Sequence, residues 1–189
     1  SLTRVDGDAR KWARELYDAN YPNKTVAFPK RRAKLLAKAG VAAQERKDFA
    51  QAAKLFEASA VLYRPLDANV ASALHRKAIC TQPTSNPEGS WTEAADLYAE
   101  AARLAERAGL VPNQALSLYN QAGCLNPKQN PDGSYDAASA LYEQAAALFK
   151  QIGRDTNAVK ALPAHAAMMH SWAWAHQPDR NPAVLLGWE

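Results

Sequence analysis

Long apolar runs are missing from this chain. No stretch of about 18 apolar residues is present to span a bilayer, and the first residues, SLTRVDGDARKW, lack the charged-then-apolar order of a secretory signal. We therefore expect no transmembrane segment and a cytoplasmic protein, or an effector delivered to the cytoplasm, unless a leader preceded Ser1. The 189 residues are 48% apolar and 22% charged, which suits one domain with a sizeable core.

Motifs that carry catalysis or bind cofactors are also missing. No Gly-rich phosphate loop follows a strand pattern, and no Ser/His/Asp or Cys/His set has family-like flanking residues. His165, His170 and His176 fall in one expected helix, but their spacing puts them on different sides or too far apart to share an ion. We expect neither an enzyme nor a cofactor or metal site.

One pattern recurs three times along the chain. Each copy opens with an aromatic residue and has two small residues three places on, Leu at the seventh place and Phe or Tyr at the eighth. The copies are FAQAAKLFEASA from Phe49, WTEAADLYAEAA from Trp91 and YDAASALYEQAA from Tyr135. In the second copy the apolar positions step by three and four residues, which predicts amphipathic α-helices.

Nearly identical turns precede two of these copies. They read NPEGSW from Asn86 and NPDGSY from Asn130, 44 residues apart. Asn-Pro-x-Gly suits a type I turn because Pro presets φ and Asn can bond its own backbone. Ser90 and Ser134 then stand where an N-cap is needed, and Ser90 with Glu93 fits a capping box. The duplicated turn predicts two helical hairpins that share one elbow.

A partner helix, called here the first helix of each unit, is expected upstream of each copy. The three lie near residues 29–45, 69–80 and 113–124, and a fourth near 157–176 has no following copy. Self-similarity at such a period is typical of a solenoid, whose units bury their apolar faces only by stacking. The sequence therefore predicts an all-α, right-handed superhelix of about three helical hairpins plus a capping helix.

The regions outside these hairpins have simpler expected roles. We assign residues 1–28 to an N-terminal helix and linker; the helix near 8–20 has Trp12, Leu16 and Tyr17 on one side and is expected to pack on the first hairpin. The repeat domain takes residues 29–176. The tail, 177–189, packs on the last helix or, alternatively, is an exposed partner-binding peptide.

The repeated residues resemble those of the tetratricopeptide family and, more loosely, its longer-helix, SNAP-like relatives. The stretch LLAKAGVAAQERKDFAQAAKLFEASAVLYRP matches that motif at Leu36, Gly40, Ala43, Ala52 and Phe56. The later copies have first turns longer by three residues, and their period exceeds the family's usual 34, so HEAT-type repeats of about 40–47 residues are the alternative. The resemblance implies a protein-binding scaffold whose first helices line a concave face.

Five residues are then candidates for a peptide-binding groove. They flank the small-residue place of successive first helices: Arg76, Lys77, Asn120, Gln121 and His165. They are similar to the carboxylate-gripping positions of chaperone-binding tetratricopeptide proteins, although the full clamp pattern is absent, and cationic and amide donors can hold a peptide carboxylate. The expected function is a protein interaction scaffold that takes a peptide or helix of another protein in this groove. The alternative is a solvated groove.

Basic residues concentrate near the N-terminus. Residues 1–47 hold 12 Lys/Arg against 5 Asp/Glu, whereas the rest of the chain holds 11 against 14. The densest run is PKRRAKLLAKAG, with the basic patch Lys30, Arg31, Arg32, Lys34 and Lys38. Such a helix could grip nucleic-acid phosphates or anionic lipid headgroups, which gives a second functional hypothesis. The competing interpretation is a solvated outer face of the first repeat helix.

The two cysteines, Cys80 and Cys124, share the 44-residue spacing of the elbows. Equivalent positions on stacked helices lie about 8–10 Å apart, beyond the roughly 4.4–6.8 Å between the Cα atoms of a disulfide. The sequence predicts two free, buried thiols; a reactive thiol is the alternative.

Overall fold

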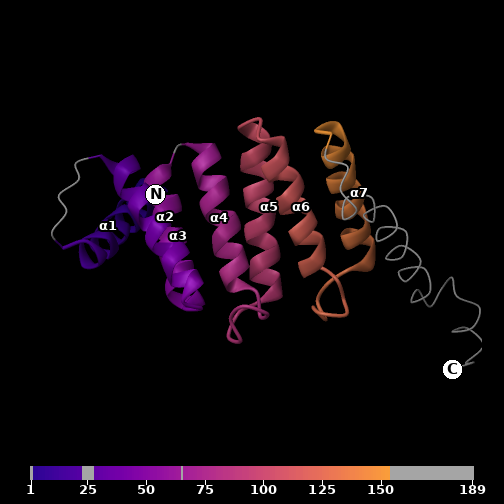
Figure 1. Ribbon diagram of the computed structural model, residues 1–189, viewed down its shortest axis with the longest axis horizontal. Coiled ribbons are helices and arrows are strands. Elements are labelled where there is room, and N and C mark those ends of the chain that lie inside the picture. Colours follow the sequence, from indigo (N-terminus) through magenta and orange to yellow (C-terminus); the bar gives the residue numbers. More distant parts are fainter. Residues whose placement is uncertain (1, 23–27, 65, 154–189) are drawn as a thin grey trace, which may run out of the picture.

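A computed structural model of the protein describes residues 2–22, 28–64 and 66–153 (Figure 1). Every regular element within these ranges is an α-helix. The helices are α1 (Leu2–Asn20), α2 (Pro29–Glu45), α3 (Phe49–Tyr63), α4 (Asp67–Thr81), α5 (Trp91–Arg107), α6 (Val111–Cys124) and α7 (Tyr135–Gln151). None of these seven is long and apolar enough to cross a bilayer.

Consecutive helices pack on one another, so that α2 to α7 stand side by side in a row (Figure 1). They form three hairpins, α2 with α3, α4 with α5, and α6 with α7, and each hairpin packs on the next through α3 with α4 and α5 with α6. The predicted all-α superhelical arrangement is confirmed. The expected capping helix at 157–176 and the tail at 177–189 lie outside the described residues.

The aromatic at the eighth place of each repeat is the centre of its hairpin. Phe56, Tyr98 and Tyr142 are 0%, 1% and 8% exposed, and alanines three and four residues away on the same helices are buried beside them. A ring surrounded by small side chains fills the space between helices that approach closely. Gly40 of α2 shows how close this approach is, because a Cβ added there would lie 2.8 Å from Phe56 Cε1.

The two elbows have the same hydrogen bonds 44 residues apart. The amides of Gly89 and Gly133 donate to the carbonyls of Asn86 and Asn130, each at 2.8 Å. The side-chain oxygen of each Asn accepts from the backbone amide two residues later in the chain. A Cβ on either glycine would meet a backbone carbonyl at the end of the preceding helix. The predicted turns are confirmed, and glycine is required because the loop folds back onto that helix.

The capping box predicted for Ser90 and Glu93 is half right. Ser90 Oγ accepts from the Glu93 amide at 3.2 Å, as an N-cap should. The other bond of a capping box, from the Ser90 amide to the Glu93 carboxylate, is replaced, because the Ser90 amide donates to the Thr81 carbonyl at 3.0 Å. The folded-back elbow thus occupies the donor that a capping box would use, and the Glu93 carboxylate pairs with Lys77 instead.

Helix α1 packs on α3 and, less extensively, on α2, as predicted. It begins at Leu2, earlier than the expected start at residue 8. Its buried face is formed by Ala13 and Tyr17 with Leu16 packed beside them, whereas Trp12 is 36% exposed, so the expectation holds for Tyr17 and Leu16 and is wrong for Trp12. The Tyr21 hydroxyl, just beyond the helix, donates to the Leu35 carbonyl at 2.9 Å and ties α1 to α2.

Replacing Gly40 by Ala is expected to lower the free energy of unfolding by about 1–3 kcal/mol, because Phe56 is fully buried and its ring cannot yield. Gly123→Ala is the matched control at the same place of the third unit, where the nearest atom to an added Cβ is Tyr142 Oη at 3.8 Å. That variant should be neutral or up to about 1 kcal/mol more stable. Urea unfolding followed by circular dichroism measures both, and equal effects would contradict the argument.

Candidate functional site

Two hollows open along the first helices of the three hairpins. One, of about 230 Å³, lies between α2 and α4, and the other, of about 310 Å³, lies between α4 and α6. Ser72 and Arg76 of α4 line both hollows, so the two adjoin at these residues. We call this surface the first-helix groove.

The first-helix groove is basic and partly apolar. Three cations line it, Lys34 and Lys38 from α2 and Arg76 from α4, and none of the described residues that line it is acidic. Both α4 and α6 contribute neutral polar and apolar side chains to it: Asn69, Ser72, Ile79, Asn113, Leu116 and Ser117. Leu116 is 45% exposed and adds apolar surface to the groove. This lining offers charge-assisted and neutral hydrogen bonds beside apolar contacts.

His75 joins α4 to α6 in this groove. Its Nδ1 lies 2.9 Å from Ser117 Oγ, and its Nε2 lies 3.4 Å from Asn120 Nδ2. A neutral ring satisfies both contacts when Nδ1 donates to Ser117 and Nε2 accepts from the Asn120 amide. Burial, aided by the positive charge of Arg76, lowers the pKa of His75 to about 4. The ring is therefore neutral at physiological pH and holds two first helices together.

The ring of His75 also has a counterpart one repeat later. It meets Tyr98 edge-on with centroids 5.0 Å apart, and Tyr119 meets Tyr142 in the same way at 5.7 Å. Both members of the second pair follow the first by 44 residues. His75 therefore occupies a packing position that takes an aromatic ring, which indicates a structural role.

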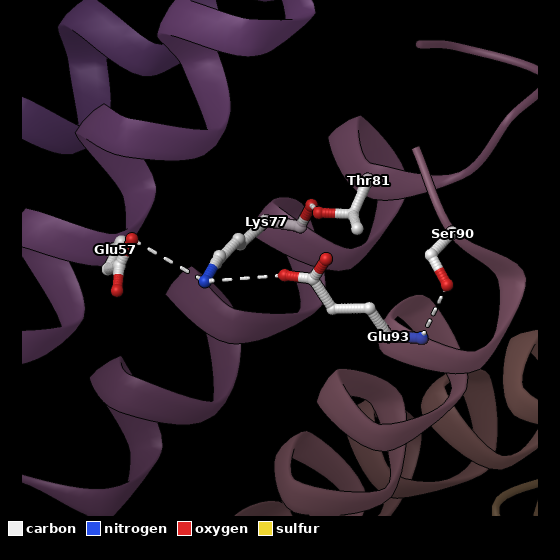
Figure 2. A network of polar contacts seen from close by, with 5 residues as sticks. All are labelled: Glu57, Lys77, Thr81, Ser90 and Glu93. Carbon is white, nitrogen blue, oxygen red and sulfur yellow. Dashed lines mark hydrogen bonds and ion pairs between the residues drawn. The ribbon is translucent and has the colours of Figure 1, made fainter. Parts of the chain in front are cut away.

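Lys77, expected to line the groove, does not do so. Its side chain is only 16% exposed and lies between the second helices of two hairpins, 3.5 Å from Glu57 of α3 and 3.9 Å from Glu93 of α5. Figure 2 shows the ammonium nitrogen between the two carboxylates. Lys77 follows Arg76 by about 100° around α4, and its ion pairs hold its side chain toward α3 and α5, away from the groove.

The other predicted groove residues have different outcomes. Arg76 lines both hollows, and Asn120 reaches the groove through its contact with His75. Gln121 is half-buried and is not among the residues that line the groove. His165 lies outside the described residues.

The basic patch is divided between two surfaces. Lys34 and Lys38 line the first-helix groove, so they do not lie on an outer face. Arg32 lies on another side of α2, with its guanidinium carbon 5.5 Å from the centroid of Tyr17, and it lines a separate hollow. Lys30 and Arg31 are exposed at the start of α2, where Arg31 lies over Phe28 at 5.6 Å.

The prediction for the two cysteines is confirmed. Cys80 and Cys124 are free and buried, and burial raises the pKa of each thiol to about 11. Gln82 donates to Cys124 Sγ at 3.5 Å and to the Tyr98 hydroxyl at 3.0 Å. Thiols with raised pKa values are poor nucleophiles at neutral pH, so both act as small core residues.

Sequence reasoning missed several residues of the groove. His75, Asn69 and Asn113 were not singled out, although Asn69 and Asn113 are 44 residues apart and take the same place in successive units. That equivalence is the signal that could have identified them. Among the described residues, no cluster of three or more His, Cys, Asp or Glu side chains could hold a metal ion.

Comparison with known proteins does not identify a family. No protein-family model matches the chain, and no curated protein matches it. The resemblance to tetratricopeptide repeats therefore rests on the residues of this chain alone.

Acidification from pH 7 to pH 5 is expected to destabilise the fold in part through His75. Above an unfolded-state pKa of about 6.5 the ring is neutral in both states. As the pH falls from there towards the folded-state pKa of about 4, the unfolded chain binds a proton that the folded ring does not accept. The free energy of unfolding then falls by up to about 1.4 kcal/mol per pH unit.

Urea unfolding of the wild type and of His75→Gln at both pH values measures this contribution. The carboxylates titrate alike in the two proteins, so the difference isolates His75. If the free energy of unfolding of His75→Gln depends on pH as that of the wild type does, the His75 ring is not the cause of the loss of stability on acidification.

Proposed function

We propose that this protein is an interaction scaffold that binds an acidic peptide segment of a partner protein in the first-helix groove. The observation that carries the proposal is the charge of the two adjoining hollows along α2, α4 and α6, which have three cations and no acidic residue among the described side chains that line them. A peptide laid across the three first helices would meet donors from each hairpin.

The chemistry of the groove favours carboxylates over other ligands. Lys34, Lys38 and Arg76 supply charged donors, and Asn69 and Asn113 supply neutral amides at equivalent places of two units. Charge-assisted bonds orient a carboxylate, whereas the exposed Leu116 and the neighbouring Ile79 offer apolar contact for an adjacent side chain. Acidic residues interleaved with aliphatic ones are the expected ligand sequence.

The wider assignment follows from this proposal. We infer a tetratricopeptide-like repeat architecture, a non-catalytic role without a cofactor, and action in the cytoplasm. The small residues and aromatics of the three hairpins support the first inference, and the raised thiol pKa values together with the structural contacts of His75 support the second.

Binding of nucleic acid or anionic lipid through the N-terminal basic patch is the second candidate function. The concentration of positive charge in residues 1–47 favours it. The division of the patch between two surfaces counts against it, because Arg32 does not share a face with Lys34 and Lys38. We therefore rank it below peptide binding.

Peptides selected against the full chain from a random display library are expected to be rich in Asp and Glu with interspersed Leu or Ile. Lys38→Gln combined with Arg76→Gln should weaken binding of a selected peptide about tenfold in Kd, because two partly exposed charge pairs are lost. Fluorescence anisotropy with a labelled peptide gives the affinities.

Lys54→Gln is a control for the loss of one positive charge outside the groove, because Lys54 is exposed on α3 and does not line the groove. It should leave the affinity unchanged. Selection of peptides without acidic enrichment, or equal weakening by Lys54→Gln, would rule out the groove as the binding site.

The nucleic-acid alternative is tested by the salt dependence of binding to a single-stranded RNA. Replacing Lys30, Arg31, Arg32, Lys34 and Lys38 together by Gln should abolish RNA binding if the patch is the site. Our proposal expects only weak RNA binding by the wild type, lost steeply with added salt. Tight binding at physiological salt that the five replacements remove would instead favour the second candidate.

A further inference from the structure

Four arginines from three segments of the chain converge on one hollow outside the first-helix groove. Arg10 and Arg14 come from one face of α1, Arg32 from the start of α2, and Arg64 directly follows α3. The hollow is completed by Pro29 of α2 and by Val61 and Leu62 of α3, and it has a volume of about 250 Å³. We call it the arginine hollow.

The fold fixes where the backbone of each of these arginines lies around the hollow. Tyr17, fully buried, and Tyr21, bonded to the Leu35 carbonyl, lock α1 against α2 and α3. Arg32 is held over the ring of Tyr17 at 5.5 Å and is half-buried. The docking of α1 therefore brings two arginines of its own to a hollow that already carries Arg32 and Arg64.

Like charges gathered around one hollow repel one another, and a bound anion would relieve that repulsion. No acidic side chain is among the described residues that line the arginine hollow. The start of α2 adds to the positive potential, since Pro29 stands in its first turn and neither a side-chain cap nor an acidic residue is found there. A guanidinium has five donors, so an arginine with a contact inside the chain can still bind an anion.

The size of the hollow narrows the class of anion. Pockets for drug-sized ligands start at roughly 300 Å³, so a hollow of about 250 Å³ suits a compact group. Paired N–H donors of arginine match the spacing of phosphate oxygens, which makes arginine the preferred partner of phosphate. The apolar lining is limited to the edges of Pro29, Val61 and Leu62.

We propose that the arginine hollow binds a compact, multiply charged phosphate group, either of a free phosphorylated compound or of a phosphomonoester lipid headgroup. The site is independent of the first-helix groove, because the two share no lining residue. Its occupant would clamp α1 to the first hairpin, since donors from both bind the same anion.

Calorimetric titration of the full chain with pyrophosphate tests the site. We expect saturable binding at one site per chain, and a rise in the unfolding temperature with pyrophosphate but not with chloride at equal ionic strength. Arg14→Gln and Arg64→Gln should each weaken binding roughly tenfold or more, because each removes charge-assisted bonds. Arg14→Lys, which keeps the charge but loses the paired donors, should fall between Arg14→Gln and the wild type.

Arg103→Gln is the control, because Arg103 is exposed on α5, far from the hollow in sequence, and its loss removes the same charge. Circular dichroism establishes that each variant is folded; should Arg64→Gln fail to fold, Arg14→Gln on the exposed face of α1 still decides the question. No saturable binding by the wild type, or weakening by Arg103→Gln as large as by Arg14→Gln, would overturn the proposal.

Vesicles distinguish the two sources of phosphate. Flotation with phosphatidylcholine vesicles that contain phosphatidic acid, compared with phosphatidylcholine alone, tests the lipid headgroup. Capture that Arg14→Gln removes assigns the site to a lipid, whereas pyrophosphate binding without capture assigns it to a soluble compound. Capture that survives Arg14→Gln, together with absent pyrophosphate binding, would show that another surface binds anions and would contradict the proposal.

Discussion

Each hairpin depends on one large ring enclosed by small side chains. Phe56 lies against Gly40 so closely that even a methyl group would have no room, and Tyr142 faces Gly123 in the third unit. Because alanine dominates the buried positions around these rings, the helices approach closely and leave little space for water. The stacking of hairpins, the row of first helices and the groove along them all follow from this close approach.

That packing also separates the charges of α4 into two roles. Lys77 points between α3 and α5 and pairs with both Glu57 and Glu93 at the junction of two hairpins, although exposed carboxylates make each pair weak. Arg76, one residue earlier, lines the groove between first helices and lies 5.9 Å from the ring of Phe56. The rotation of one helix therefore decides which cation stabilises the stack and which one can meet a ligand.

Much of the fold could be predicted from the sequence because its signals are local. Aromatic and alanine spacing located α3, α5 and α7 at their true first residues, and the Asn-Pro-x-Gly-Ser turns located the elbows. The site was harder to predict, since it depends on helix rotation and on long-range contacts. Lys77 was misplaced because the rotation of α4 about its axis was not known. Glu93 was misassigned to a capping box because the Thr81 carbonyl, nine residues before Ser90, takes the amide that the box requires.

The elbows have a further consequence for how such a chain can change length. The repeated backbone bonds of the two turns join residues within one loop or to the end of the helix before it. A block of 44 residues thus contains its own joint, and adding or deleting one would leave the neighbouring joints intact. The protein is built so that its array can grow by whole modules, with the aromatic ring of each new module finding the same small-residue surface on the helix before it.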